Sequence, residues 1–334
     1  MPWSRVVSFT DPFSYQSAFR SVEVELFPTA KGEFRAELTQ VSMNKLWVHG
    51  AHEDLPRIYI GAVKPHRAAI GFLTKAKQPA TQHCGMEVLP GDIVINDTDL
   101  MYRRTEANCH WGSMSLPRDD LSAACKAVAG HECARLSFKH LVRPSPDLTS
   151  RLLGLHELVS QLAKATPNIL SLPEVARALE QELILAMIRC LTEGEPSEMT
   201  AGGRRHDMII ARFEEFLETH PDQPLYLTEI CAAIGVAERT LRVACEEHLG
   251  MAPIRFLSLR RMHLVHRALR QADPLTTTVT RIATDHGFWE LGRFSVAYRT
   301  LFGESPSASL RRPSEDHVVC PKRPSSLESP ILHH

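Results

Sequence analysis

A repeat in the C-terminal part of this 334-residue chain constrains its fold more than any other sequence feature. The runs 228–236 and 280–288 align with threonine, isoleucine and glycine at matching positions, 52 residues apart. After one inserted residue, the matching pairs are Leu241 with Phe294, Gly250 with Gly303, and Pro253 with Pro306. Two copies of one helix-loop-helix unit explain this self-similarity.

Each copy has the layout of a helix-turn-helix, in which a short helix with small residues packs closely on a second helix. Gly235 and Gly287 end the short helices, where a positive φ costs little only without a Cβ. We expect Thr228 and Thr280 to cap these helices. The residues expected to build the two units are Thr228, Ile230, Gly235, Leu241, Thr280, Ile282, Gly287, Phe288 and Phe294.

The second helix of each unit carries a polar face that is a candidate for DNA contact. The candidates are Glu238, Arg239, Thr240 and Arg242 in the first unit, and Leu291, Gly292, Arg293, Ser295 and Arg299 in the second. Arginine can read guanine bidentately, and threonine can bond a base or touch a thymine methyl. We expect Arg299 to meet phosphate instead. The alternative is that these are solvated helix residues that pair with neighbouring glutamates.

The segment 253–272 separates the two units and also has a helical pattern. Its 20 residues would span about 30 Å as a helix. Successive major grooves on one face of DNA recur about every 34 Å. A connecting helix of this length can therefore hold two recognition helices in successive grooves.

The last hundred or so residues resemble the DNA-binding domain of the AraC/XylS family of bacterial transcriptional regulators. The resemblance is carried by Leu-Gly-Met-Ala-Pro at 249–253, Gly-Phe at 287–288 and Phe-Gly-Glu-Ser-Pro at 302–306. It implies a sequence-specific regulator of double-stranded promoter DNA, most often an activator that acts on recruitment of RNA polymerase. It also implies an N-terminal domain that binds a small-molecule effector or forms a homodimer.

The chain departs from the family pattern at several positions on the recognition helices. Ala237 stands where a serine is frequent, Glu246 and Glu247 replace basic residues, and Val296 stands where arginine is common. Residues 204–312 contain fifteen arginines, no lysine and thirteen acidic residues, a net charge of only +2. Fewer basic groups predict fewer phosphate contacts and a shallower salt dependence of DNA binding.

The N-terminal part has the pattern of closely spaced short strands, typical of a small barrel or sandwich. The expected strands are 34–43, 45–49, 57–60, 69–73, 86–89, 93–95 and 110–116. The turn Leu-Pro-Gly-Asp at 89–92 resembles the cupin-like sensor domain of the family. The expected fold class is therefore α+β multidomain, with an N-terminal cupin-like β-barrel plus helices and a C-terminal all-α domain of two helix-turn-helix motifs joined by a long helix.

Amphipathic helices are expected at 121–129, 152–162 and 173–191. The last two have apolar faces that either pack on the barrel or form a dimer seam. The expected organisation is a sensor domain at 1–140, a helical dimerisation or packing region at 141–193, a linker at 194–206, the DNA-binding domain at 207–312 and a disordered tail at 313–334.

Four aromatic residues, Trp47, Tyr59, Phe72 and Trp111, are candidates for the wall of an effector pocket, although they suit a barrel core equally. The neighbours His83 and Cys84 would point to opposite faces of a strand, so we expect neither a metal site nor a cofactor. The sequence contains no nucleophile-elbow, P-loop or Gly-x-Gly-x-x-Gly motif. We therefore do not expect an enzyme. The alternatives are a cupin-like metal-dependent enzyme with a helical appendage, and a regulator that uses its barrel only for dimerisation.

The overall composition is that of a soluble protein, with 43% hydrophobic and 23% charged residues and a net charge of −1. No apolar run approaches the roughly 18–20 residues of a membrane span. The first residues lack the pattern of a signal peptide. Eight cysteines without a CxxC pair predict reduced thiols. We therefore expect a cytoplasmic protein with no membrane partner.

Overall fold

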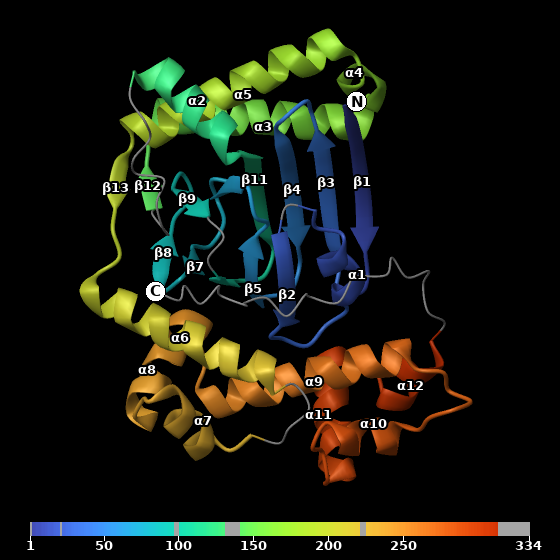
Figure 1. Ribbon diagram of the computed structural model, residues 1–334. Helices are drawn as coiled ribbons and strands as arrows, with labels where there is room; N and C mark the ends of the chain where they lie inside the picture. The colour runs from blue at the N-terminus through green and yellow to red at the C-terminus, as the bar shows by residue number, and fades with distance from the viewer. Residues whose placement is uncertain (1, 21, 97–99, 131–140, 221–224, 313–334) are drawn as a thin grey trace, which may run out of the picture.

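The structure is a computed structural model that describes residues 2–20, 22–96, 100–130, 141–220 and 225–312. The tail expected to be disordered, 313–334, lies outside these residues. The structure is built in layers (Figure 1). In order, these are a layer of helices, a large sheet, a smaller sheet and the helical C-terminal part. The coarse fold class, sheet-rich in the N-terminal part and helical in the C-terminal part, is confirmed.

The larger sheet has eight strands in the order β1-β3-β4-β11-β6-β9-β12-β13, paired antiparallel. Register is fixed along its centre, where Trp111 of β11 lies opposite Leu73 of β6 and Ala51 of β4. The strands are β1 (Trp3–Phe9), β3 (Ala36–Ser42), β4 (Trp47–Glu53), β6 (Arg67–Leu73), β9 (Ile93–Asn96), β11 (Cys109–Pro117), β12 (Leu141–Arg143) and β13 (Glu195–Ser197).

The smaller sheet has five strands in the order β2-β5-β10-β7-β8. These are β2 (Val22–Pro28), β5 (Arg57–Val63), β10 (Met101–Thr105), β7 (Thr81–His83) and β8 (Met86–Val88), and the short helix α1 (Pro12–Ser17) precedes β2. Residues of both sheets line one interior cavity, so the sheets lie face to face. Among the described residues, the strand pairings form these two sheets and no single closed barrel.

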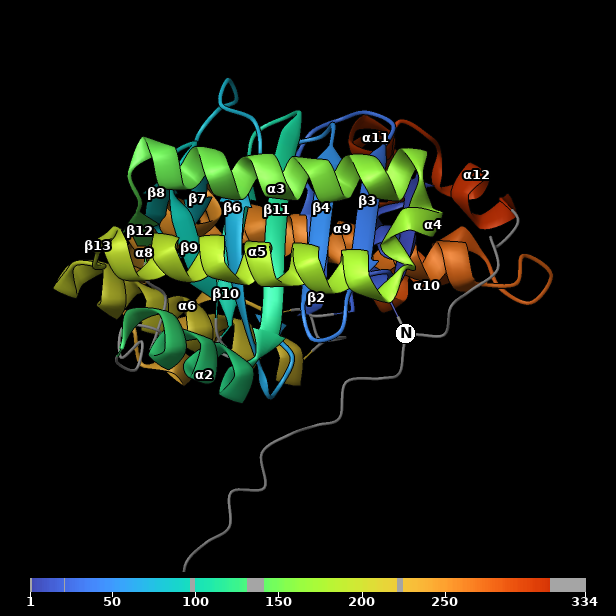
Figure 2. The ribbon, with the colours of Figure 1, turned by 90° about the horizontal axis from the view of Figure 1, so that it is seen from above.

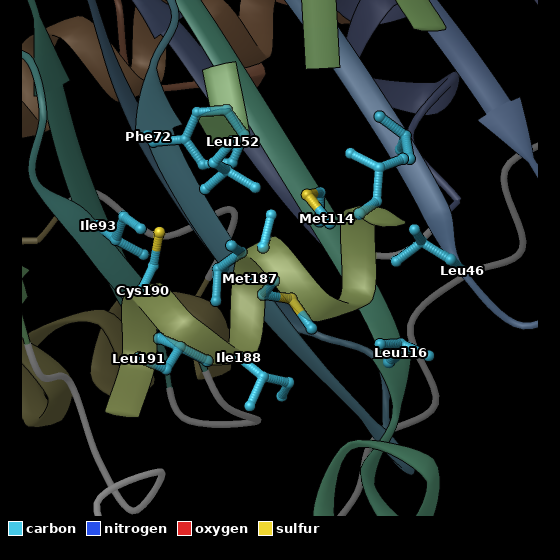
Figure 3. Packing of buried hydrophobic residues seen from close by; sticks show 14 of the residues in the cluster. Leu46, Phe72, Ile93, Met114, Leu116, Leu152, Met187, Ile188, Cys190 and Leu191 are labelled. Atoms are coloured by element: carbon cyan, nitrogen blue, oxygen red, sulfur yellow. The ribbon is translucent and has the colours of Figure 1, made fainter. Parts of the chain in front are cut away.

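Four helices cover the outer face of the larger sheet (Figure 2). They are α2 (Arg118–Ala129), α3 (Pro146–Ala165), α4 (Pro167–Leu170) and α5 (Pro173–Glu193). Phe72 and Met114 of the sheet pack against Leu152 of α3 and Met187 of α5 in one apolar cluster (Figure 3). Proline at the first position starts α3, α4 and α5, because its missing N–H has no intrahelical partner there.

The segment 194–206 was expected to be a linker because it is rich in helix breakers. It instead contains β13, which pairs with β12, and the first turns of α6 (Ala201–Thr219). The Thr200 hydroxyl accepts a hydrogen bond of 3.0 Å from the Gly203 N–H. This side-chain cap offsets the poor helix propensity of Gly202 and Gly203 at the helix start.

The C-terminal helices continue with α7 (Leu227–Ile234), α8 (Glu238–Leu249), α9 (Pro253–Gln271), α10 (Val279–Asp285), α11 (Leu291–Phe302) and α12 (Pro306–Arg311). The core of the first unit is continuous with the smaller sheet, because Leu241 and Phe256 belong to the same cluster as Ile58 and Tyr102. The second unit has a separate cluster that includes Phe294 and Tyr298. The two copies of the repeat are therefore packed differently.

Most of the expected strands coincide with observed ones, but the expected set omits β1, β2, β7, β10, β12 and β13. Strand β10 is hidden in the sequence because Arg103 and Arg104 stand side by side and mask its alternation. Among the described residues, no helix combines the length and apolar composition needed to cross a membrane.

Among the cysteines that the structure describes, the expectation of reduced thiols fails for Cys125. Cys125 of α2 is disulfide-bonded, whereas Cys84, Cys109, Cys190, Cys231 and Cys245 are free. The absence of CxxC spacing in the sequence does not exclude pairing between cysteines farther apart, which depends on the fold.

Candidate nucleic-acid interface

The two repeats have the same turn geometry. The Val236 N–H donates to the Cys231 carbonyl at 3.0 Å, and the Phe288 N–H donates to the Ala283 carbonyl at 2.9 Å. Gly235 and Gly287 have φ of 67° and 79°, as their sequence positions predicted. Each turn thus ends the short helix and leads into the second helix, with the same local geometry in both units.

The predicted caps are wrong by two residues in both units. Thr228 lies within α7, whose N-cap is Tyr226; the Glu229 carboxylate accepts from the Tyr226 N–H at 3.2 Å. Thr280 lies within α10, where the Thr278 hydroxyl accepts from the Arg281 N–H at 3.2 Å. Threonines occupy 276–278 as well as 280, so the residue type alone does not identify the capping position.

The α8 helix buries Leu241, Ala244, Cys245 and Leu249 completely. Its opposite face exposes Glu238, Arg239, Arg242 and Val243, while Thr240 is half-buried. Arg242 donates to Glu238 at 3.0 Å, and both side chains are about half exposed. An exposed ion pair of this kind contributes at most about 1 kcal/mol to stability. An anion that binds more strongly can therefore displace Glu238 from Arg242.

The α11 helix buries Phe294 and Tyr298 and exposes Gly292, Arg293, Ser295 and Arg299. The Arg293 side chain is 86% exposed and lies 2.7 Å from Glu290. Two apolar residues are also exposed, Trp289 by 73% and Val296 by 70%. Leu291, expected on the DNA-facing surface, is half-buried against the apolar cluster of the second unit.

The first unit rests on the smaller sheet through the end of α8. The buried His248 ring lies 6.4 Å from the Tyr102 ring of β10. Gly85, in the β7–β8 turn, has a φ of 76°, and a Cβ there would lie 2.9 Å from His248 Cε1. The Arg104 side chain packs against Gly250, where α8 ends.

The connecting helix α9 also faces the N-terminal part. Its His263 ring is 3.0 Å from the Pro28 carbonyl, and Arg260 and Arg267 each lie 3.9 Å from Glu25 of β2. Burial lowers the pKa of His263 to about 3. A neutral His263 therefore donates its Nε2–H to Pro28.

The four aromatic residues expected to line an effector pocket divide into two groups. Tyr59 and Trp111 line the cavity between the sheets. Phe72 instead points into the helix-covered core, 5.2 Å from the His156 ring, and Trp47 stacks under Arg67 at 4.0 Å. The alternation of side chains along a strand separates Phe72 from Trp111, which belong to neighbouring strands but opposite faces.

Sequence reasoning missed the polar residues of this cavity. Arg103 is 4% exposed, and its guanidinium carbon lies 3.4 Å from the Trp111 ring and 5.1 Å from the Tyr59 ring. Glu53 and Arg57 also line the cavity, as a buried ion pair, and the Tyr15 hydroxyl donates to Glu53. The only sequence signal for these residues was the presence of charged side chains within strands.

A family model, several relatives and solved structures match this chain. Residues 230–312 match a family model described as a helix-turn-helix domain. The "Probable thc operon regulatory protein" of Rhodococcus erythropolis is 35% identical over 158 residues, which are 47% of this chain and 46% of that protein. The chain thus spans about half the length of that relative.

A second relative is matched over most of its length. The "XylDLEGF operon transcriptional activator 2" of Pseudomonas putida is 31% identical over 119 residues, which are 35% of this chain and 74% of that protein. The crystal structure of the AraC-like transcriptional activator CuxR has a TM-score of 0.40 and 15% identity, covering 78% of this chain and 94% of that chain. With the matched family model and these relatives, the chain belongs to the AraC/XylS family of transcriptional regulators.

Proposed function

We propose that this protein regulates transcription by inserting α8 and α11 into two successive major grooves of promoter DNA. The observation that carries the proposal is the pair of equivalent helices with exposed arginines, joined by α9. That helix has 19 residues and is therefore about 28 Å long, close to the roughly 34 Å repeat of the major groove. Residues 207–312 then act as the DNA-binding domain.

The base-reading residues of the proposal are Arg239 and Arg242 on α8 and Arg293 and Ser295 on α11. Arginine at such positions would pair with guanine, and Arg299 would contact phosphate. The exposed Val296 and Trp289 suit thymine methyl groups, which offer an apolar contact in the major groove. Glu238, Thr240, Leu291 and Gly292 would shape the fit of the helices without dominating the readout.

The experiment that tests the proposal is selection of bound fragments from a genomic library by the purified protein at near-physiological salt. Enrichment of one motif with two patches about one helical turn apart is the expected result. Recovery of no motif by the folded protein, with and without extracts containing small metabolites, would overturn the proposal.

A substitution then identifies the readout of the second unit. Arg293→Ala should relax discrimination at one base position by about 1–3 kcal/mol. Arg281→Ala is the matched control, since Arg281 is also exposed and paired with an acidic residue, Asp285, but lies on α10. Titration of both variants against single-base variants of the selected motif measures the difference. An unchanged preference in Arg293→Ala would remove Arg293 from the readout.

The N-terminal part would act as a cupin-like sensor rather than an enzyme, with a small-molecule effector in the cavity between the sheets. Strand β10 supports this arrangement, because Arg103 faces the cavity while Tyr102 and Arg104 meet α8. An effector that shifts β10 would change the support of the first recognition helix. We also propose that the protein activates transcription through RNA polymerase, that it is cytoplasmic and that it forms a homodimer.

For the homodimer, the candidate surface lies on the helices that cover the larger sheet. Leu158 of α3 and Leu185 of α5 expose 43% and 36% of their surface. Light scattering of the wild-type protein and of a Leu158→Glu, Leu185→Glu double variant distinguishes a dimer through this face from a monomer.

A further inference from the structure

A pocket of about 370 Å³ lies between the N-terminal part and the second helix-turn-helix unit. One side is formed by the start of α1 and the segment between β2 and β3, and the other by α9 and the ends of α11 and α12. We call it the α9 pocket. None of its described lining residues also lines the cavity between the sheets. Its volume falls within the range of about 300–1,000 Å³ that is typical of small-molecule sites.

Two polar atoms face each other across this pocket without a hydrogen bond. Asp11 Oδ1 lies 3.9 Å from His266 Nε2, and each side chain is only 12% exposed. The other carboxylate oxygen, Asp11 Oδ2, accepts from the Ser14 N–H at 2.7 Å and from the Ser14 hydroxyl at 2.9 Å. Oδ1 is therefore the oxygen that remains for a ligand.

A chain of hydrogen bonds shows which nitrogen of His266 carries the proton. The Glu304 carboxylate only accepts, so the Ser309 hydroxyl donates to it at 2.8 Å. The Ser309 oxygen in turn accepts from the Tyr298 hydroxyl at 2.8 Å. Tyr298 has then used its one hydrogen, so it accepts from the His266 Nδ1–H at 2.6 Å. His266 Nε2 consequently has a lone pair and no hydrogen.

The His266 ring is neutral and therefore cannot serve as a counter-ion for Asp11. Burial is the main cause that lowers the pKa of His266 to about 4, and the nearby Arg270 and Arg312 contribute to the same shift. At neutral pH, two acceptors thus lie side by side in the pocket with no hydrogen between them. A group that donates at least two hydrogens can bridge them.

The other acidic residues of the pocket are already paired. Glu304 lies 3.3 Å from Arg312, and Glu33 lies 3.0 Å from Arg35. Among the described residues, no lysine or arginine lies within 4 Å of the Asp11 carboxylate. The pocket therefore has an excess negative charge at Asp11, in a place where water screens it only partly.

Going beyond the proposed function, we infer that the α9 pocket binds a primary ammonium ion with an apolar group, whose N–H groups bridge Asp11 Oδ1 and His266 Nε2. An ammonium group has three donors and no acceptor, and it can approach both atoms to about 2.8 Å. The rest of the wall includes the apolar Phe34, Leu55 and Phe302, which suit the apolar group of the ligand. An anion would be repelled by Asp11, and a hydroxyl group has only one hydrogen for the two acceptors.

Such a ligand would join the N-terminal part to the second unit. Asp11 caps α1, whereas His266 is on α9 and bonds to Tyr298 of α11. The first unit already shares a core with the smaller sheet, but the second does not. If the protein reads DNA with α8 and α11, as proposed above, the ligand would restrain the second recognition helix relative to the first.

The test is calorimetric titration of the full-length protein near neutral pH with benzylamine, benzyl alcohol and benzoate at matched ionic strength. The three probes share one ring and differ in the charge and the hydrogens of the polar group, so we expect benzylamine to bind most tightly and benzoate not to bind. Asp11→Asn should weaken benzylamine binding about 10–100-fold, the value of a hydrogen bond to a charged group. Asparagine still caps α1.

The matched control is Asp92→Asn. Asp92 is also buried and also accepts a backbone N–H, from Leu89 at 3.0 Å, but it lies outside the pocket. This substitution should leave the affinity for benzylamine unchanged.

Nitrogen-15 NMR of the histidine-labelled protein is a second measurement that needs no change at Asp11. The His266 signals, assigned by comparison with His266→Gln, should be those of the Nδ1–H tautomer. The Nε2 resonance should shift toward that of a hydrogen-bonded nitrogen when benzylamine is added, and benzoate should leave it unchanged.

The remaining results decide against the inference. Absence of benzylamine binding, equal binding of benzyl alcohol or benzoate, or full affinity in Asp11→Asn would overturn it. If Asp11→Asn does not fold, the titrations and the NMR of the wild-type protein still decide. Selection of a DNA motif without benzylamine binding would refute this pocket alone, whereas benzylamine binding without DNA selection would refute the DNA-binding function alone.

Discussion

At the scale of the residue, one glycine determines the position of the cavity's indole ring. A Cβ at Gly71 would lie 2.2 Å from Trp111 Cζ2, so the ring occupies the space that any side chain would need. We expect Gly71→Ala to lower the free energy of unfolding by about 1–3 kcal/mol, as overpacking of a core does. Urea denaturation followed by fluorescence measures the change.

The matched control is Gly154→Ala on α3, where an added Cβ meets nothing within 4 Å. This substitution should stabilise the protein by about 0.5–1 kcal/mol, because alanine is the better helix former. A Gly71→Ala protein as stable as wild type would mean that Trp111 can move freely, and the rigid aromatic support of Arg103 would be disproved.

At the scale of the element, α9 carries the buried His263 and the partly buried His266 toward the N-terminal part. Burial lowers the pKa of His263 to about 3 and that of His266 to about 4; Arg267 and Arg270 on the same helix, and Arg312, oppose protonation further. Asp11 lies 3.9 Å from His266 and Glu25 faces Arg267, but desolvation outweighs them. Both imidazoles are therefore neutral in the folded protein at pH 5.

The neutral histidines make the stability of the protein depend on pH. Unfolded histidine has a pKa near 6.5, so below that pH the unfolded state binds protons that the native state does not. Stability should fall from pH 7 to pH 5, by about 2 kcal/mol in total for each such histidine, because the slope reaches about 1.4 kcal/mol per pH unit only well below pH 6.5. His263→Gln keeps a donor for Pro28 and should lose less stability than wild type over this range in urea denaturation. Parallel pH profiles for the two proteins would contradict this account of His263.

At the scale of the whole molecule, the first helix-turn-helix unit shares its core with the smaller sheet and the second does not. Gly85→Ala places a methyl group against His248 and should loosen this contact. We expect faster hydrogen exchange at the end of α8 and unchanged exchange in α10 and α11, measured by mass spectrometry.

Gly130→Ala is the control, because Gly130 has the same φ of 76° but an added Cβ there meets none of the described residues within 4 Å. It imposes the same backbone strain without touching the contact between the two parts. Equal changes in the two variants, or loosening of α11 in Gly85→Ala, would show that the two units are not supported independently.

The sequence by itself determined the repeat, its two glycine turns and the exposed arginines of α8 and α11, because these depend on local periodicity and on the steric freedom of glycine. Local pattern also located most strands of the N-terminal part. It misplaced the helix caps at Thr228 and Thr280, since several nearby residues can cap equally well. It also treated 194–206 as a linker, although β13 pairs there with a strand more than fifty residues away.

Only the tertiary structure decided which faces meet. Tyr59 and Trp111 share a cavity, whereas Phe72 points away from it, because pairing and register of distant strands determine which side chains share an interior. Arg103 contacts the rings of Tyr59 and Trp111, and its strand contacts α8. These contacts bring together residues that are far apart in the chain. Such contacts arise from burial and long-range packing, which no local pattern of residues contains.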